Sequence, residues 1–345
     1  MATRIAINGL GRIGRAVFKI ALDTPELQVV AVNDIVPADN LAYLLKYDTV
    51  YGRYEKHVEA EENALIVDGE RYPVFGEKDP ANLPWRDLKV DIAIESTGVF
   101  TREEQLRKHI EAGAKHVILS APVRGSDGEA EILTVVHGVN SPDAAPQIIS
   151  CASCTTNCIT PVVEILGRRI GIKKAIMTTV HAYTSSQSIV DSPSKSWNRG
   201  RAGAANLVPT TTGAAKAATK ALPQYEGMFD GVAVRAPVTV GSISDVIFVT
   251  ERETTKEEVN AIFREEAQSE RYKDVVAVTE DPIVSSDIIQ DPHASIIDLN
   301  MTMVVGGDLV KVMSWYDNEW GYASQLIREA VHMGEVEPVM AGAAP

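Results

Sequence analysis

The sequence predicts a protein of two domains: an α/β domain built on a parallel sheet, then an α+β domain with an antiparallel or mixed sheet. Strand-like and helix-like stretches alternate as far as Ile149, and such alternation predicts a parallel sheet with helices on both faces. Beyond that point, strand-like runs follow one another with few helices between them, which favours antiparallel pairing. The length of 345 residues suits two domains that each bury a core.

The first strand and helix frame a glycine-rich turn. An apolar run, Thr3–Asn8, leads into Gly9-Leu10-Gly11-Arg12-Ile13-Gly14, and apolar residues then recur at helical spacing. A second strand, Gln28–Asn33, ends at Asp34. This order predicts a Rossmann-type dinucleotide site, with the helix N-terminus facing the pyrophosphate and the Asp34 carboxylate accepting from a ribose hydroxyl. The carboxylate would repel a 2′-phosphate, which favours NAD over NADP; an ordinary glycine-rich turn is the alternative.

Further alternation extends the first domain. Val90–Thr97 reads as a strand, Thr101 and Glu104 as the capping box of a helix that ends near Gly113, and His116–Ser120 as the next strand. Ligands of open α/β sheets bind at the carboxyl ends of the strands. Ser120 is therefore a cofactor-site candidate, with a role as a turn former as the alternative.

All three cysteines, Cys151, Cys154 and Cys158, stand within eight residues, between a strand ending at Ile149 and a helix expected over 159–172 and delayed by Pro161. A thiol at that junction lies near free backbone N–H groups, which favour the thiolate. We therefore expect Cys154 to be a nucleophile. The cluster is too tightly spaced for a disulfide framework, and no further ligand stands at zinc-finger spacing, so we expect no metal.

The second domain is expected to begin near Ser150. His181 stands near the end of its first strand, 174–182, and a long segment without clear period follows over 183–209. A loop of that length in a compact domain is usually functional or disordered. The remaining expected elements are helices at 213–221, 255–270 (exposed, with Thr255 and Glu258 as capping box) and 318–333, and strands at 231–240, 242–250, 275–279, 295–305 and 309–315.

Charge and hydropathy exclude several classes of protein. The formal net charge of −14 disfavours nucleic acid and anionic membranes as partners. No apolar run approaches the ~20 residues of a membrane span, and no signal peptide is evident, so we expect a cytoplasmic address.

A cysteine nucleophile beside a nicotinamide site indicates one type of chemistry. His181 would deprotonate Cys154 and later shuttle a proton, although a lone histidine is more often a satisfied core residue. Arg199, Arg201 and Arg235 are candidates for binding an anion. The thiolate would add to an aldehyde to give a hemithioacetal, loss of hydride to NAD would leave a thioester, and phosphate would cleave that thioester.

At these residues the chain resembles the phosphorylating glyceraldehyde-3-phosphate dehydrogenase family, from Ile5 to about Gly334. The matching stretches are 7–15 around the glycines, Ala152-Ser153-Cys154-Thr155-Thr156-Asn157-Cys158, Thr179-Val180-His181-Ala182-Tyr183-Thr184, Thr212-Gly213-Ala214-Ala215-Lys216 and Trp315-Tyr316-Asp317-Asn318-Glu319-Trp320-Gly321-Tyr322.

The resemblance implies a role for each matching residue. Cys154 would be the nucleophile and His181 its base. NAD would be bound by the glycine turn (Gly9, Gly11, Arg12, Ile13, Gly14), by Asp34 and Lys78 on the adenosine side, and by Ser120 and Asn318 on the nicotinamide side. Thr184 and Arg235 would bind the phosphate of glyceraldehyde 3-phosphate. Inorganic phosphate would be bound by Ser153, Thr155, Thr212, Gly213 and Arg201.

The resemblance also implies quaternary structure and domain limits. The segment 183–209 is similar to a loop that lies against the cofactor of a neighbouring subunit in the family, which implies a homotetramer. Residues 1–152 and 316–335 would form the dinucleotide-binding domain and 153–315 the catalytic domain, with 336–345 a loose tail.

The sequence departs from the family pattern at several points. Cys151 replaces the usual Asn, the long loop is one residue shorter, and Ser192-Pro193 replaces a pair that helps to exclude a 2′-phosphate. Use of NADP therefore stays open beside NAD. The alternatives are an erythrose-4-phosphate dehydrogenase and a non-catalytic NAD-sensing protein. Cys158 is either a packed small residue or an oxidation partner of Cys154.

Overall fold

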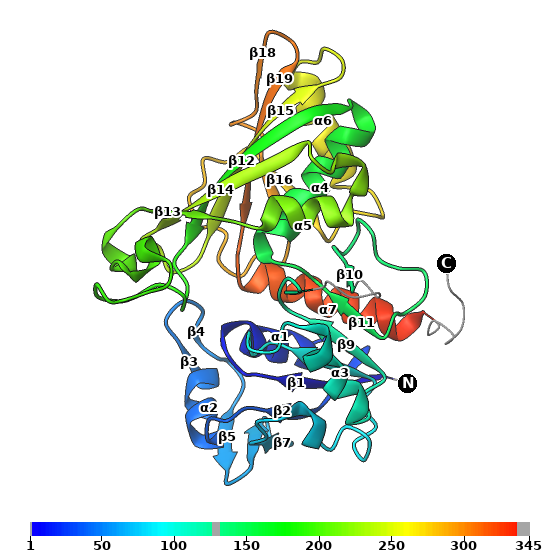
Figure 1. The fold of residues 1–345 in the computed structure, drawn as a ribbon, viewed down its shortest axis with the longest axis vertical. Coiled ribbons are helices and arrows are strands. Elements are labelled where there is room, and N and C mark those ends of the chain that lie inside the picture. Colours follow the sequence, from blue (N-terminus) through cyan, green and yellow to red (C-terminus); the bar gives the residue numbers. More distant parts are fainter. Residues whose placement is uncertain (1, 126–131, 337–345) are drawn as a thin grey trace. The chain divides into compact units, whose positions relative to one another are not determined.

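A computed structural model describes residues 2–125 and 132–336 (Figure 1). The chain divides into two compact units. Of the described residues, the first unit holds those up to His137, Ser141–Ala152 and those from Leu326 onward. The second unit holds Gly138–Asn140 and Ser153–Gln325. Each unit has its own sheet and core.

The sheet of the first unit has nine strands in the order β10-β11-β9-β8-β1-β2-β7-β6-β5. The pairs from β10 to β7 are parallel and the hairpins β7–β6 and β6–β5 are antiparallel. The strand bounds are β1 Thr3–Asn8, β2 Leu27–Asn33, β5 Val58–Glu61, β6 Ala64–Val67, β7 Glu70–Phe75, β8 Ile92–Glu95, β9 His116–Leu119, β10 Leu133–Thr134 and β11 Ile148–Ser150, with β3 Tyr47–Asp48 and β4 Gly52–Arg53 as a separate hairpin.

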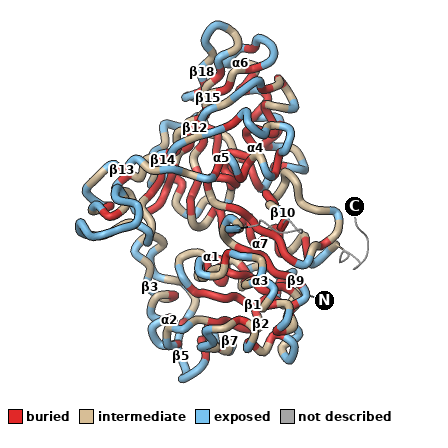
Figure 2. Tube along the Cα trace, viewed as in Figure 1, coloured by how far each residue is buried: buried red, intermediate tan, exposed pale blue. Residues whose placement is uncertain are grey.

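The central strands of this sheet are buried along their whole length. Every residue of β8 and β9 is buried, as are the last four of β1 (Figure 2). Strands covered on both faces are read as continuous apolar runs rather than alternating ones. This explains why the sequence predicts the alternation of strands and helices well here.

The helices of the first unit are α1 Arg12–Leu22, α2 Ala38–Lys46, α3 Glu103–Glu111 and the short 3₁₀ turn η1 Pro80–Asn82. The expected capping box of α3 is wrong. Gln105, not Glu104, turns back to the chain, and its Oε1 accepts from the backbone N–H groups of Thr101 and Arg102, each at 3.1 Å. The N-cap is Arg102, so the helix begins one residue later than a cap at Thr101 would place it.

The second unit carries a mixed sheet in the order β13-β14-β12-β15-β19-β17-β16, with β18 paired to β19. The pairs β12–β14 and β16–β17 are parallel and the others antiparallel. The bounds are β12 Ile172–Ala182, β13 Val208–Thr211, β14 Phe229–Ala236, β15 Ser242–Thr250, β16 Val276–Thr279, β17 Ser295–Asp298, β18 Met303–Val305 and β19 Leu309–Tyr316. The run expected over 295–305 is therefore two strands.

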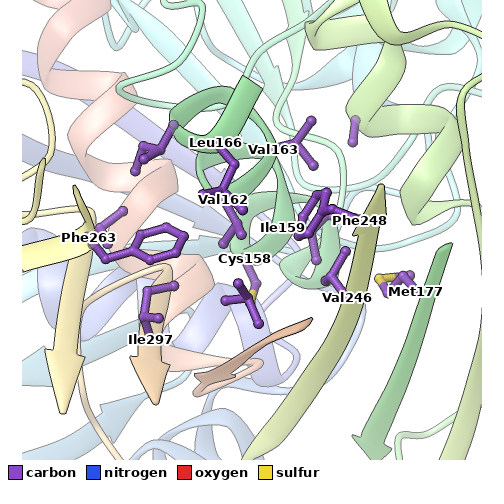
Figure 3. Close-up of a cluster of buried hydrophobic side chains, with 14 of the residues drawn as sticks. Cys158, Ile159, Val162, Val163, Leu166, Met177, Val246, Phe248, Phe263 and Ile297 are labelled. Atoms are coloured by element: carbon purple, nitrogen blue, oxygen red, sulfur yellow. The ribbon is translucent and has the colours of Figure 1, made fainter. Parts of the chain in front are cut away.

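Three helices cover one face of this sheet: α4 Cys154–Arg169, α5 Ala214–Ala221 and α6 Lys256–Glu266. Their apolar side chains pack with Met177 of β12 and with Val246 and Phe248 of β15 in one core (Figure 3). Alternate residues of β12 point away from that core, and Ile176 on the opposite face is 61% exposed. The sheet thus has one packed face and one open face in this chain.

The helix after the cysteines begins five residues before the expected start. The polar residues 154–158 and Pro161 suggested a delayed start, but α4 begins at Cys154 and contains Pro161. Proline inside a helix removes one hydrogen bond and costs about 3 kcal/mol in an exposed helix. Every residue from Thr155 to Leu166 is buried, so tertiary packing outweighs that cost.

The other differences concern loops and ends. The segment 183–209 holds two 3₁₀ turns, η2 Trp197–Gly200 and η3 Gly203–Ala205; a third, η4 Pro223–Tyr225, follows α5. At α6 only half of the expected capping box forms. Thr255 accepts from the N–H of Glu258 at 3.2 Å, whereas the Glu258 carboxylate binds Arg252 and Thr254. That helix also buries one face rather than being exposed.

The last helix, α7, spans Trp320–Glu335. The tail expected to be loose lies outside the described residues from position 337. No helix among the described residues is long and apolar enough to cross a membrane.

Candidate active site

Cys154 occupies the first position of α4, directly after a sharp turn. Ser153 is the N-cap, and its hydroxyl accepts from the backbone N–H of Thr156 at 3.2 Å. Ala152 has φ of 52°, in the left-handed region that residues with a Cβ seldom adopt. The turn from β11 into α4 is therefore tight, and it sets Cys154 at the positive end of the helix.

His181 reaches Cys154 because of the period of β12. Met177, Thr179 and His181 alternate along the strand on the face that packs against the helices, and all three are buried. The Nε2 atom of His181 lies 3.3 Å from the Sγ of Cys154. Two residues 27 positions apart are thus brought together by one strand and one helix terminus.

Arg235 completes a close group around the histidine. In the parallel pair β12–β14 it is the register partner of His181. Its Nη1 lies 2.6 Å from His181 Nδ1 and 3.0 Å from the carbonyl oxygen of Ala182, while Nδ1 lies 2.7 Å from that same oxygen. The Nδ1 atom cannot both donate to the carbonyl and accept from the guanidinium. Arg235 Nε is buried with no partner.

Burial, rather than the helix terminus, sets the protonation of the pair. It raises the pKa of the Cys154 thiol, although the Arg235 charge and hydrogen bonds from Thr155 oppose this. Burial and, after it, the charge of Arg235 lower the pKa of His181 to about 3. The direction for Cys154 opposes the one that the helix terminus favours, and the preformed thiolate stays a prediction. A neutral thiol faces a neutral imidazole that can act as its base.

A buried hydroxyl group supports both members of the pair. The hydroxyl of Tyr316 lies 2.9 Å from Oγ1 of Thr155 and 2.9 Å from Oγ1 of Thr179. Its ring meets the His181 ring edge-on, with centroids 5.9 Å apart. We assigned no role to Tyr316 from sequence, although it stands in a matching stretch. Its position at the end of β19, beside β15, is what brings it here.

The anion candidates separate into two groups. Arg201 forms an exposed ion pair with Asp191, 2.7 Å from Nε to Oδ2, within its own loop. Arg199 instead hydrogen-bonds Thr210, and its charge acts on both His181 and Arg235. Arg199 was a candidate from sequence, but Arg201 was preferred. The structure favours Arg199 as the second cation of the site.

The other second-unit candidates lie at loop and helix starts. Thr184 hydrogen-bonds Ser186 and Gln187 in the long loop. Gly213 is the N-cap of α5, and Thr212 Oγ1 accepts from the N–H of Ala214 at 3.2 Å. Asn318 accepts at Oδ1 from the N–H of Gly241 and the hydroxyl of Ser242. Its amide NH₂ is thereby the end that a ligand carbonyl could use.

The three glycines of the turn between β1 and α1 serve different purposes. Gly9 has φ of +93°, and a Cβ there would lie 2.7 Å from the Thr97 backbone. A Cβ at Gly14 would lie 1.9 Å from the carbonyl oxygen of Gly9. A Cβ at Gly11 would meet no protein atom within 4 Å. Gly11 therefore leaves room for something other than the protein, as the close approach of a pyrophosphate requires.

A pocket of about 350 Å³ opens beside these glycines. It is lined by Asn8, Gly9, Gly11, Asn33, Asp34, Ile35, Glu77, Lys78, Ser96, Thr97, Val99 and Phe100. Asp34 accepts from the backbone N–H groups of Leu10 and Val36, at 2.7 and 3.0 Å, so its carboxylate is fixed at the rim. A pocket lined by a carboxylate, a lysine and the N-cap glycine of α1 fits a dinucleotide.

The remaining cofactor candidates lie nearby in the fold. Arg12 and Ile13 are the first residues of α1. The Arg12 guanidinium pairs with Asp48 and lies over the Tyr51 ring. Ser120 follows β9, and its N–H donates to the carbonyl of Glu95.

The three cysteines are free thiols. Cys158 is buried and lies 3.4 Å from the Ser314 hydroxyl, and burial raises its pKa to about 12. Among the described residues, no group of His, Cys, Asp or Glu side chains is arranged to hold a metal ion.

Comparisons with known proteins agree with this arrangement. Residues 3–103 match the family profile "Glyceraldehyde 3-phosphate dehydrogenase, NAD binding domain", and residues 153–318 match "Glyceraldehyde 3-phosphate dehydrogenase, C-terminal domain". The chain is 47% identical over 338 residues to glyceraldehyde-3-phosphate dehydrogenase 2 of Streptomyces avermitilis, covering 97% of this chain and 99% of that one.

Two further relatives are similar over nearly their whole length. The glyceraldehyde-3-phosphate dehydrogenase of Thermotoga maritima is 49% identical over 328 residues, 94% of this chain and 97% of the relative. That of Geobacillus stearothermophilus is 46% identical over 336 residues, 96% and 98% of the two chains. The chain therefore belongs to the glyceraldehyde-3-phosphate dehydrogenase family.

Proposed function

We propose that this protein oxidises and phosphorylates D-glyceraldehyde 3-phosphate to 1,3-bisphosphoglycerate, with NAD as hydride acceptor and inorganic phosphate as second substrate. The observation that carries the proposal is the Cys154–His181 contact of 3.3 Å at a helix N-terminus, in a chain whose relatives are named for this activity.

Cys154 supplies the nucleophile and His181 the base. Because burial keeps both groups neutral, the proton passes from sulfur to Nε2 as the carbon–sulfur bond forms, and the helix N-terminus favours the developing anion. The hemithioacetal then loses hydride to become a thioester. His181 holds the proton meanwhile and can return one when phosphate displaces the sulfur.

Two cations offer a place for phosphate groups. Arg235 lies beside His181, and its Nε has no hydrogen-bond partner. The charge of Arg199 acts on both His181 and Arg235. Thr155, held by Tyr316, together with Ser153, Thr212 and Gly213 at the starts of α4 and α5, adds hydroxyl and N–H donors. We assign Arg235 and Thr184 to the substrate phosphate and the helix starts with Arg199 to inorganic phosphate.

The first unit would hold NAD. Gly9, Gly11 and Gly14 shape the turn, Arg12 and Ile13 offer N–H groups, and Asp34 and Lys78 line the pocket. NAD, when bound, accepts the hydride. Asn318 and Ser120 would hold its nicotinamide half. We propose accordingly that the first unit is the dinucleotide-binding domain and the second the catalytic domain, that NAD is preferred to NADP, and that no metal takes part.

A homotetramer is part of the same proposal. Large apolar side chains stand exposed on the open sheet face and in the long loop, including Ile176, Val232, Ile189 and Trp197; the last two are 89% and 87% exposed. Exposed apolar surface of this kind is typical of a protein interface. Light scattering should give a mass of four chains, and a monomer at micromolar concentration would contradict this. We also propose a cytoplasmic location.

The deciding experiment follows NADH formation by absorbance. The protein is given glyceraldehyde 3-phosphate with NAD or NADP, with and without inorganic phosphate, and erythrose 4-phosphate in parallel. We expect fast turnover only with the first aldehyde, NAD and phosphate together. A stronger response to erythrose 4-phosphate would favour the related dehydrogenase. No turnover despite NAD binding would point to a non-catalytic NAD-binding protein.

A further inference from the structure

Beneath the dinucleotide pocket of the first unit, a chain of buried polar side chains runs across the sheet. Its members are Asn33 at the end of β2, Asn8 at the end of β1, Glu95 at the end of β8, His109 in α3 and Trp85. Each of them is at most 4% exposed. Glu95 stands in the middle, fully buried, and its carboxyl group lies 3.2 Å from Nε2 of His109.

One end of the chain is fixed by a backbone group. The N–H of Glu77 can only donate, and it donates to Oδ1 of Asn33 at 2.9 Å. The amide nitrogen of Asn33 therefore donates to Oδ1 of Asn8 at 2.7 Å. That leaves the amide nitrogen of Asn8 facing Oε2 of Glu95, 2.5 Å away. From this side Glu95 must accept.

The other end is fixed by an indole. The Nε1–H of Trp85 can only donate, and it lies 3.0 Å from Nδ1 of His109. Nδ1 must therefore accept, so the proton of the imidazole is on Nε2. Nε2 lies 3.2 Å from Oε2 of Glu95 and donates to it. His109 is thus a neutral imidazole in a single tautomer, and the contact is a hydrogen bond rather than an ion pair.

The second oxygen of Glu95 also receives donors. The backbone N–H of Thr97 donates to Oε1 at 2.8 Å. Thr97 Oγ1 accepts from the N–H of Val99, so its own hydrogen is directed to Oε1 of Glu95. All four groups around the carboxyl group are donors. A carboxylic acid or an amide would place a hydrogen against at least one of them.

We propose that Glu95 is a positioning residue for NAD, whose ionised carboxylate holds the ends of β1 and β2 and the segment after β8 in register. Asn8, Asn33 and Thr97, which line the pocket, are joined through this one acceptor. The turn after β1 also packs closely against the segment after β8, because a Cβ on Gly9 would lie only 2.7 Å from the Thr97 backbone. Glu95 itself is not among the lining residues. The inference rests on the proposed function, since it takes the pocket as the NAD site.

If Glu95 only filled space in the core, its replacement by an amide of the same size would leave NAD binding unchanged. Glu95→Gln keeps the size and shape of the side chain, so packing is preserved. Its NH₂ group, however, must face either Thr97 or the donors Asn8 and His109. His109 cannot change tautomer to accept from that NH₂, because Trp85 donates to its other nitrogen. In the double variant Glu95→Gln/Trp85→Phe the indole donor is gone, so His109 is free to accept at Nε2.

The test measures the NAD dissociation constant by titration calorimetry on the full-length protein. We expect Glu95→Gln to weaken NAD binding about 10- to 100-fold, the effect of leaving a buried donor unpaired. The double variant should recover part of that loss, although Trp85→Phe alone should not tighten binding. Glu329→Gln, which replaces another fully buried glutamate of the first unit outside the pocket lining, is the matched control and should bind NAD normally.

A second measurement is made on the wild-type protein, and a variant is needed only to assign the signals. Nitrogen-15 NMR of the histidine side chains, with the His109 signals assigned by their loss in His109→Gln, should show a neutral Nε2–H tautomer at neutral pH.

Three results would overturn the inference: unchanged NAD affinity in folded Glu95→Gln, a double variant that binds more weakly than the single one, or an imidazolium at His109. Failure of the wild-type protein to bind NAD would instead refute the proposed function.

Discussion

The polar groups under the dinucleotide pocket and those around the nucleophile are arranged in opposite ways. In the first set, every donor from Glu77 to Trp85 meets an acceptor, and one assignment of hydrogens satisfies all contacts. In the second set, His181 Nδ1, the Ala182 carbonyl and Arg235 Nη1 lie within 3.0 Å of one another and cannot all be paired.

The difference separates groups that shape a site from groups that react in it. A fully paired buried network is rigid, and it can hold a pocket ready before the ligand arrives. An incompletely paired cation and a neutral thiol–imidazole pair need a partner from outside. We infer that an anionic substrate binds the guanidinium of Arg235 and thereby supplies the acceptor that the second set lacks. The predictions below test whether the two regions can be disturbed independently.

The largest effect is expected from Cys154→Ala. Without the sulfur no covalent intermediate forms, and turnover should fall by about 10⁴-fold or more. NAD affinity should stay within about twofold of the wild-type value, because the pocket and its network lie in the other unit. Steady-state kinetics and titration calorimetry give the two numbers. If both activity and NAD binding were lost, Cys154 would be a structural residue instead.

Next in size is the acid sensitivity that His181 gives the fold. The pKa of His181 is about 3 in the folded chain, below the ordinary value near 6.5. The unfolded chain thus binds a proton that the folded chain does not, and stability falls as the pH drops from about 6.5 toward 3. The loss is up to about 5 kcal/mol, since each pKa unit corresponds to about 1.4 kcal/mol. His181→Gln should lack this part of the acid denaturation. The measurement is the change in the urea unfolding midpoint between pH 7 and low pH, for the wild-type protein and for His181→Gln. An equal change in both proteins would show that His181 is not neutral and buried.

Arg235 provides the third test. Arg235→Met removes the charge but keeps much of the apolar stem, and kcat/KM for glyceraldehyde 3-phosphate should fall about 100-fold. Arg235→Lys keeps the charge without the two-pronged geometry and should recover only part of that loss. The NAD affinity of both should be unchanged. An undiminished kcat/KM in Arg235→Met would remove Arg235 from substrate binding.

The sequence predicts the first unit more completely than the second. β1, α1 and β2 carry local signals, because the glycine turn, the helical spacing and the acid at the strand end all lie within about 35 residues. The Cys154–His181 pair also follows from local features, the strand period and a helix start. The expected start of α4 is wrong because burial of Thr155–Leu166, which no local signal reports, outweighs Pro161.

Other parts of the site depend on contacts far apart in sequence. Tyr316 meets Thr155 across 161 positions, through the register of β15 and β19. Whether Arg199 or Arg201 serves the site is decided by Asp191, whose pairing with Arg201 has no periodic signature. The pKa of Cys154 also depends on contacts far apart in sequence, since the charge of Arg235 opposes the effect of burial. A helix terminus can be predicted from local sequence, whereas the depth at which the thiol is buried cannot.

The smallest expected effect concerns the rim of the pocket rather than its support. Asp34 is anchored by two backbone N–H groups, from Leu10 and Val36. Its carboxylate still presents negative charge toward the position expected for the ribose. Asp34→Asn keeps one acceptor and the side-chain shape but removes that charge. The ratio of kcat/KM for NADP to that for NAD should therefore rise about tenfold, mainly through NADP.

The effect of Asp34→Asn should differ in kind from that of Glu95→Gln. Glu95→Gln should weaken the binding of NAD and of NADP equally, because it loosens the segments that line the pocket for both cofactors. A parallel loss with both cofactors in Asp34→Asn would mean that Asp34 shapes the pocket rather than selects the ligand. Selection would then have to come from another part of the chain, such as Ser192, where the sequence departs from the family pattern.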